Sequence, residues 1–199
     1  GIDSEELFKM VLDADENALL IPAHAWTPWF AVFGSQSGFD SLEECFGEMT
    51  KYVVAVETGL SSDPTMNWRL SALDDIFLVS NSDAHSLDKL GREANVFDMS
   101  EPNYRELRRI LVERDRKKFL ETIEFFPEEG KYHADGHRDC KYWCEPKETR
   151  RLKGVCPKCG KPLTIGVLHR VEALADRESG FWPPQAVPFR SIMPLAELV

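Results

Sequence analysis

Short apolar runs alternate with segments of helical periodicity along the first 130 residues. Three runs are apolar on both faces, which is typical of buried strands, over residues 18–23, 52–56 and 76–81. Capping residues and apolar positions at helical spacing predict helices over about residues 4–16, 41–49, 64–73 and 100–119, with a connecting strand over 121–126. Because helices separate the first three strands, the pattern predicts an α/β fold with right-handed crossovers and a mainly parallel sheet, open or closed as a barrel.

Each of the three predicted strands ends in a residue that can bind a metal or transfer a proton. His24 follows the first strand, Glu57 ends the second, and Asp83 with His85 follows the third. The carboxyl ends of parallel strands meet at one edge of a sheet, and ligands collect there. Imidazole and carboxylate together suit zinc, manganese or iron, which activate water for hydrolysis of phosphate esters. A packed loop histidine at position 24 and a turn-capping role for Glu57 are the ordinary alternatives.

The composition is that of a globular protein. With 43% hydrophobic and 29% charged residues, the chain is neither a disordered tail nor a fibrous repeat. No stretch approaches the roughly 20 apolar residues of a membrane span, and no signal peptide is evident, so we expect a cytoplasmic protein without a membrane partner. The chain begins with Gly1 and ends in what looks like the start of another amphipathic segment. We therefore expect it to be a piece of a longer protein.

Four of the five cysteines lie within twenty positions of one another. They form a Cys-x3-Cys pair and a Cys-x2-Cys pair, which are Cys140, Cys144, Cys156 and Cys159. This pattern is typical of a zinc ribbon, in which four thiolates hold one structural zinc and leave no coordination position open. Disulfides are the alternative, but nothing in the sequence indicates secretion.

The cysteine region is basic, although the whole chain has a formal net charge of −10. Residues 131–170 contain ten Lys or Arg and only four Asp or Glu. Together with Tyr142 and Trp143, basic side chains here can contact phosphates and stack on bases, and a solvated basic face is the alternative. The candidates for contact with nucleic acid are Arg150, Arg151, Lys153 and Lys158. Pro162 stands where a phosphate-binding loop requires Ser or Thr, so we expect no nucleotide cofactor.

Several motifs resemble known families. Residues 21–30, 56–64 and 80–85 (IPAHAWTPWF, VETGLSSDP and SNSDAH) resemble the later metal-site motifs of the polymerase and histidinol phosphatase (PHP) superfamily. Residues 90–97 and 166–171 (LGREANVF and GVLHRV), together with the ribbon cysteines, resemble endonuclease Q and its bacterial relatives. The resemblance extends over nearly the whole chain.

This resemblance implies a fold and an activity. The implied fold is the C-terminal half of a PHP-type distorted β/α barrel over residues 1–127, a four-cysteine zinc ribbon over 128–175, and a tail over 176–199. The implied activity is that of a metal-dependent DNA repair endonuclease, which cleaves a phosphodiester 5′ of deaminated or abasic nucleotides. The His-x-His motif that opens the PHP metal site is absent from this sequence, so the chain itself is expected to have an incomplete site.

The resemblance also implies roles for individual residues. His24, Asp83 and His85 match ligands of the catalytic divalent metals, which are Zn, Mn, Mg or Fe, and Asp83, His85 and Glu57 are the catalytic candidates. Damaged bases are hidden in the duplex and must be extruded to be recognised. The aromatic loop after residue 25, with Trp26 and Trp29, is the candidate for stacking on DNA.

Two other functions are compatible with the same residues. A PHP-type phosphatase of a small phosphate ester uses the same metals but has no need of a basic ribbon. A non-catalytic zinc-ribbon module that binds nucleic acid predicts one zinc and no second metal. The number of metal ions per chain therefore separates these alternatives.

Overall fold

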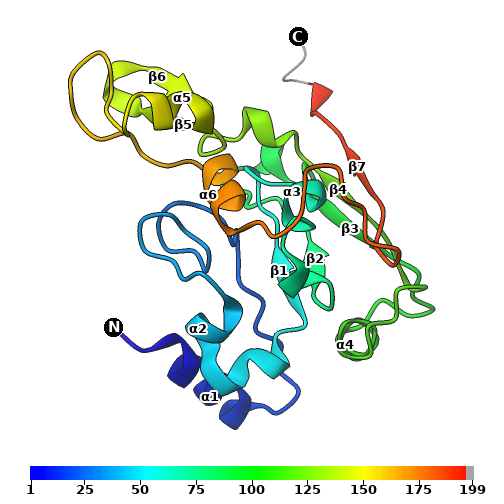
Figure 1. Cartoon of the computed structure of the whole chain (residues 1–199). Coiled ribbons are helices and arrows are strands. Elements are labelled where there is room, and N and C mark those ends of the chain that lie inside the picture. The colour runs from blue at the N-terminus through cyan, green and yellow to red at the C-terminus, as the bar shows by residue number, and fades with distance from the viewer. Residues whose placement is uncertain (196–199) are drawn as a thin grey trace.

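The computed structural model describes residues 1–195. Helix α1 (Ser4–Ala14) begins after Asp3, whose carboxylate accepts hydrogen bonds from two backbone amides of the first turn. Helix α2 (Leu42–Phe46) continues directly into a 3-10 helix, η1 (Gly47–Tyr52), and α1 packs against both (Figure 1). The predicted helices over 4–16 and 41–49 are therefore confirmed, with the second one split into two types of turn.

Two short parallel strands lie at the centre of the fold. Strand β1 (Ala55–Glu57) pairs with β2 (Phe77–Val79), and every residue of both is buried. Helix α3 (Pro64–Asn67) and the 3-10 helix η2 (Ser71–Leu73) connect them. This is the strand, helix and parallel strand arrangement that the apolar runs predict.

The strand predicted over residues 18–23 does not form. The segment instead runs beside β1 and is attached by two backbone bonds, from the Glu57 amide to the Pro22 carbonyl and from the Ala25 amide to the Glu57 carbonyl, both 3.0 Å. Pro22 has no N–H to donate, so a regular ladder cannot pass through it. The two bonds nevertheless place His24 beside the end of β1.

A second, mixed sheet adjoins the first. Strand β4 (Phe119–Glu124) lies between β3 (Ala94–Phe97), which is antiparallel to it, and β7 (Phe189–Ser191), which is parallel. Figure 1 shows β7, in red, beside the green strands of this sheet. The sequence pattern did not predict strands β3 and β7. Residues 189–191, which were expected to belong to the tail, form a strand of this sheet. The expected tail region 196–199 lies outside the described residues.

The connections around the second sheet are short helices. Helix α4 (Tyr104–Val112) buries Ile110 and Leu111. Its N-terminal cap is Asn103, and it covers only the middle of the helix predicted over residues 100–119. The remaining 3-10 turns of this region are η3 (Leu87–Lys89) and η4 (Pro127–Glu129). The fold is thus mixed α/β.

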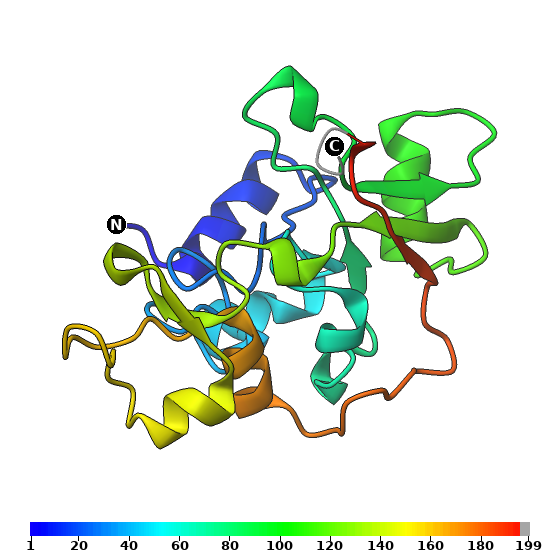
Figure 2. The same ribbon diagram turned by 90° about the horizontal axis from the view of Figure 1, so that it is seen from above.

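The cysteine region forms a separate small unit. Strands β5 (Asp135–His137) and β6 (Tyr142–Cys144) make an antiparallel hairpin around the 3-10 turn η5 (Arg138–Cys140), and helix α5 (Pro146–Arg151) follows. Helix α6 (Val167–Leu174) lies between this unit and the rest of the chain (Figures 1 and 2).

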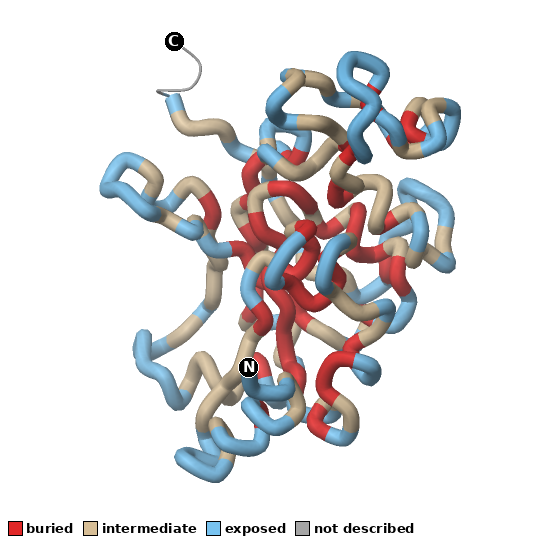
Figure 3. Tube along the Cα trace, turned by 90° about the vertical axis from the view of Figure 1, so that its left-hand side faces the viewer, coloured by how far each residue is buried: buried red, intermediate tan, exposed pale blue. Residues whose placement is uncertain are grey.

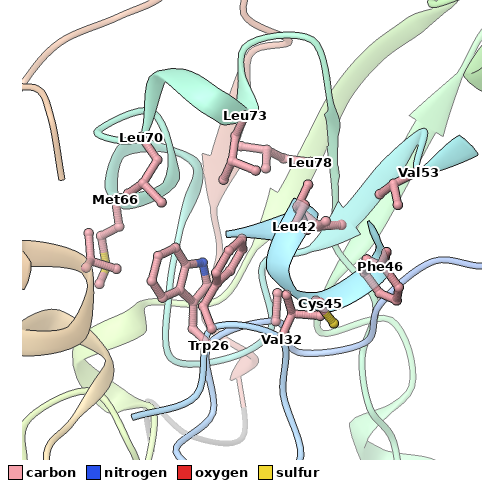
Figure 4. Close-up of a cluster of buried hydrophobic side chains, with 14 of the residues drawn as sticks. Trp26, Val32, Leu42, Cys45, Phe46, Val53, Met66, Leu70, Leu73 and Leu78 are labelled. Carbon is pink, nitrogen blue, oxygen red and sulfur yellow. The ribbon is translucent and has the colours of Figure 1, made fainter. Parts of the chain in front are cut away.

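Buried residues gather in the middle of the molecule (Figure 3). One hydrophobic cluster joins α1, α2, the 26–39 loop and α6, and a second joins the central strands to α4 and β4. Figure 4 shows Trp26 within the first cluster. Among the described residues, no helix combines the length and apolar character needed to cross a membrane.

Candidate metal and nucleic-acid site

Glu57 organises the ends of the two parallel strands. It is the last residue of β1 and is buried, and its carboxylate accepts one hydrogen bond from each side. The His24 amide donates to Oε2 at 2.5 Å, and Asn81 Nδ2 donates to Oε1 at 2.8 Å. Both carboxylate oxygens are therefore engaged by the segments that carry His24 and Asp83, so Glu57 positions these segments.

His24 and Asp83 share an unusual backbone conformation. Their φ angles are +32° and +45°, a region that residues other than glycine adopt rarely and mostly where the surrounding structure imposes it. Gly59 shows how close the packing is, since a Cβ on it would lie 2.9 Å from the Cα of His24. The two candidate ligands thus sit on backbone that is fixed by its neighbours.

In both His24 and His85, the ring nitrogen Nδ1 lies within hydrogen-bonding distance of an oxygen atom. His85 Nδ1 lies 2.9 Å from the Asp83 carbonyl, and His24 Nδ1 lies 3.1 Å from Thr27 Oγ1. A carbonyl oxygen can only accept, so Nδ1 of His85 carries the proton and Nε2 is left with the lone pair that a metal needs. The side chains of Asp83 and His85 are 49% and 86% exposed, and both can therefore reach a ligand in solvent.

The strand-end residues do not by themselves form a closed metal site. Over residues 1–195, His24, Glu57, Asp83 and His85 do not make a group of three or more ligand atoms within 4.8 Å of one another. The donor set is chemically suited to a divalent cation. Further ligands are needed to hold one in the described part of the chain.

A second group of potential ligands is closed, in the sense that all of its ligand atoms lie close enough together to bind one metal ion. Ligand atoms of His137, Cys140, Cys156 and Cys159 all lie within 4.8 Å of one another. Three of the four predicted cysteines are therefore brought together, and His137 stands in the place expected for Cys144. One imidazole and three thiolates form a recognised tetrahedral zinc set.

The hairpin explains why His137 replaces Cys144. His137 and Tyr142 are paired next to the turn, whereas Cys144 is paired with Asp135 at the other end of the hairpin. Cys144 Sγ lies instead 3.2 Å from the hydroxyl of Thr149. The sequence carries a signal for this arrangement, because His137-x2-Cys140 has the same spacing as Cys156-x2-Cys159.

The thiols of this group perturb one another. A hydrogen bond with Cys159 and burial raise the pKa of Cys140, because a second negative charge beside the other thiols is unfavourable. Burial also acts against ionisation of Cys156, but the backbone amides of Lys158 and Cys159 point at its sulfur and its pKa is lowered. A bound cation would relieve the crowding of negative charge that all three thiolates create.

The aromatic and basic candidates differ in accessibility. Trp26 is 1% exposed, and its Nε1 donates to Asn67 at 2.8 Å, so the prediction that it stacks on DNA is wrong. Trp29 is partly exposed and lies edge-on to Tyr132. A ring at position 29 is therefore available to a ligand, whereas the ring at position 26 is part of the core.

Most of the basic candidates already have partners within the chain. Arg150 pairs with Glu172 at 3.2 Å and Arg151 with Glu148 at 2.6 Å, both at the surface. Lys158 donates to the Cys140 carbonyl at 3.0 Å, and Lys153 is exposed. Exposed ion pairs are weak and exchange readily, so the arginines remain accessible to a phosphate.

The chain is similar to known proteins in both sequence and structure. No protein-family model matches the chain. It is 31% identical over 183 residues to an uncharacterised protein, MJ0043, of Methanocaldococcus jannaschii, with 88% of the chain and 22% of that protein aligned. It is 34% identical over 164 residues to the uncharacterised protein YqxK of Bacillus subtilis, with 82% of the chain and 40% of that protein aligned.

Two solved structures match the entire chain. The lesion-specific endonuclease PfuEndoQ from Pyrococcus furiosus superimposes with a TM-score of 0.83 and 32% identity over 100% of the chain. A structure of endonuclease Q with a 27-mer duplex substrate, which has an abasic lesion at the active site, gives 0.84 and 31%. The resemblance to endonuclease Q is confirmed. The chain spans about half the length of these solved chains, 48% in each case.

The endonuclease Q-like fold buries two carboxylates that the sequence analysis did not single out. Glu93 is 2% exposed and Glu124 is fully buried, and Glu93 is close enough to Glu124 and Glu57 for their charges to act on it. Thr122 and Thr58 donate to the two oxygens of Glu124, at 2.6 and 2.9 Å. Glu93 Oε1 accepts from the Phe125 amide, while its Oε2 has no partner among the described residues. Glu93 falls inside the motif of residues 90–97, which was the available signal.

Burial dominates the titration of both groups. Desolvation, with a further contribution from the charge of Glu124, raises the pKa of Glu93 to about 8. Desolvation likewise raises the pKa of Glu124 to about 7, against the hydrogen bonds from Thr122 and Thr58. Both carboxyl groups therefore keep a proton to a higher pH than an exposed glutamate does.

Replacing Glu93 by Gln is expected to stabilise the protein in alkaline solution. Folded Glu93 ionises at about pH 8 but the unfolded residue near 4.5, so between these values only the folded state binds the proton and stability falls as pH rises. Gln mimics the protonated acid and removes this penalty. Each pKa unit corresponds to about 1.4 kcal/mol, so a gain of a few kcal/mol is expected at about pH 8.5 and little change at about pH 5.

Denaturant unfolding of both proteins at the two pH values measures this difference. Glu101→Gln, a change of the same kind at an exposed position, is the matched control and is expected to leave the pH dependence unchanged. An equal effect of Glu93→Gln at both pH values would show that Glu93 is not protonated in the folded state.

Proposed function

We propose that this chain forms part of a metal-dependent DNA repair endonuclease that hydrolyses the phosphodiester 5′ of deaminated or abasic nucleotides. The observation that carries the proposal is the match of the entire chain, at 31% identity and a TM-score of 0.84, to endonuclease Q bound to an abasic duplex. Residues 1–127 then correspond to the C-terminal half of a PHP barrel and 128–175 to a zinc-binding ribbon. DNA with such lesions is the partner, and the cytoplasm is the expected location.

In this proposal the chain's residues have separate tasks. Asp83 and His85 would hold a divalent cation together with His24 and with ligands beyond this set. Such a cation would supply an activated water and stabilise charge on the phosphate. Glu57 keeps His24 and the segment before Asp83 in place through its two hydrogen bonds. The basic ribbon and Trp29 contact the DNA backbone and bases.

The His137, Cys140, Cys156 and Cys159 group has a structural task. Four protein ligands leave no coordination position for water, so zinc there holds the ribbon together rather than activating a nucleophile. The ribbon is attached to the barrel part through α6. Asp135 Oδ1 accepts from the Gly166 amide, and Asp135 Oδ2 lies 2.6 Å from His169 Nδ1. Correct folding of the ribbon therefore fixes its orientation relative to α6.

A panel of labelled duplexes tests the proposed activity. The intact gene product that carries these residues is incubated with Mn²⁺, Mg²⁺ or Zn²⁺ and with duplexes that contain uracil, hypoxanthine, an abasic analogue or no lesion. We expect one nick, 5′ of the lesion, and no cleavage of undamaged DNA. Hydrolysis of p-nitrophenyl phosphate without nicking would support the phosphatase alternative, and binding without hydrolysis of either substrate would support a non-catalytic module.

A further inference from the structure

Phe30 is the most exposed large apolar side chain of the described structure. It is 92% exposed, and its φ angle of +59° lies in the left-handed region that a bulky side chain rarely adopts. Exposure forfeits the free energy of burying the ring, and the backbone conformation costs further free energy. Within residues 1–195 no contact compensates for either cost, so the ring is available to bind another molecule.

The loop that carries Phe30 is firmly held. The Phe30 amide donates to Ser37 Oγ at 3.0 Å, which fixes the tip of the loop. Below the tip, Arg170 of α6 donates to the carbonyls of Phe33 and Phe39, at 2.9 and 3.0 Å. Figure 1 shows this loop, in blue, lying beside α6. Phe30 is therefore presented on a rigid support, not on a loose segment.

The same loop is joined to the candidate metal site and to the ribbon. Thr27 Oγ1 lies 3.1 Å from His24 Nδ1 and 3.2 Å from the Trp29 carbonyl. Ser35 Oγ donates to the Ile165 carbonyl, at the end of the ribbon, at 2.7 Å. A ring at position 30 is thus placed by hydrogen bonds to both parts of the proposed DNA-binding surface.

We propose that Phe30 is a wedge that enters the base stack at the lesion. The inference rests on the proposed function. An abasic nucleotide leaves a gap in the stack, and extrusion of a damaged base leaves the same gap. Apolar side chains that enter such a step replace the lost stacking contacts, and this requires a single projecting ring on a fixed support. Phe30 is a single projecting ring of this kind, whereas Trp26 is buried and Trp29 packs edge-on against Tyr132.

Phe30→Asn and Phe30→Trp test the wedge. Asn removes the ring and tolerates a positive φ angle, so the fold is expected to be equally stable or more stable. Binding to a duplex with a tetrahydrofuran abasic analogue is measured by anisotropy in the Asp83→Asn background, which keeps the DNA intact. A 2-aminopurine beside the analogue reports on stacking. Both the anisotropy and the 2-aminopurine fluorescence are measured with the intact gene product.

Loss of the ring is expected to weaken binding to the abasic duplex by about tenfold or more and to abolish the change in 2-aminopurine fluorescence. Phe30→Trp is expected to keep both. Ile2→Ala removes another exposed apolar side chain, which is 60% exposed near the N-terminus, and is the control for general loss of apolar surface.

Two outcomes overturn the inference in distinguishable ways. In the first outcome, the unsubstituted protein prefers and nicks lesion duplexes, but Phe30→Asn gives the same affinity and the same fluorescence change. The wedge role of Phe30 is then wrong, and the proposed function stands. If the protein with Phe30 does not prefer the lesion duplex over an undamaged one, the proposed function fails and the wedge fails with it.

Discussion

Replacing Cys140 by Ser is expected to release the ribbon metal and unfold residues of the hairpin, whereas replacing Cys144 by Ser is expected to do neither. Only Cys140 belongs to the closed group with His137, Cys156 and Cys159. Structural zinc sites contribute an apparent binding free energy of about 10–16 kcal/mol in small modules, and the energy is lost with a ligand. Zinc content per chain and limited proteolysis of the ribbon measure the two effects.

The comparison of Cys140 with Cys144 is internally controlled because the same substitution is made four positions apart in one hairpin. Cys144→Ser keeps a hydroxyl near Thr149 and is expected to cost little stability. His137→Ala completes the set and is expected to behave like Cys140→Ser. Loss of zinc from Cys144→Ser together with its retention in His137→Ala would restore the four-cysteine arrangement and contradict the structure.

Loss of the ribbon metal is also expected to affect the rest of the site. The ligand His137 is two residues from Asp135, which bonds to both ends of the first turn of α6 through Gly166 and His169. Arg170, on the same helix, supports the loop that presents Phe30. A metal bound by this group would therefore contribute to the placement of the loop that carries Phe30, although it would lie away from the strand-end residues.

The parts of the fold that could be predicted are those in which local pattern and tertiary structure agree. The cores of β1 and β2 are continuous apolar runs because both strands are buried on both faces. Strand β7 could not be found in this way, because its residues are only partly buried and it pairs with β4, which lies far earlier in the chain. Pairing over such distances leaves no local periodicity to detect.

The candidate site shows the same division. His24, Glu57, Asp83 and His85 were found because polar residues directly after apolar runs mark the ends of parallel strands. Glu93 was not singled out, because its significance comes from burial against Glu124 and Glu57, which no local pattern reveals. His137 was not among the predicted ligands for a related reason, since cysteine spacing alone does not show which end of a hairpin lies near the second pair.

Replacing Asp83 by Asn is expected to reduce nicking of lesion duplexes by about a thousandfold or more without unfolding the protein. Under the proposed function, a metal at the strand ends would lose an anionic ligand. The several kcal/mol of charge stabilisation that such a metal supplies would correspond to about tenfold in rate for each 1.4 kcal/mol. Asn tolerates the φ angle of +45° at this position, and the side chain is half exposed, so the fold has little to lose. Single-turnover nicking and metal content per chain measure the effect.

Asp88→Asn provides the matched control, since Asp88 is an exposed aspartate in the same loop with a side chain that is 72% exposed. It is expected to nick DNA at the normal rate and to retain every metal ion. In Asp83→Asn the ribbon zinc is expected to remain while metal bound in excess of it falls. Because the ribbon group and the strand-end group share no ligand, the strand-end variant is expected to lose nicking activity while it keeps the ribbon metal. Normal nicking by Asp83→Asn would remove Asp83 from the catalytic centre.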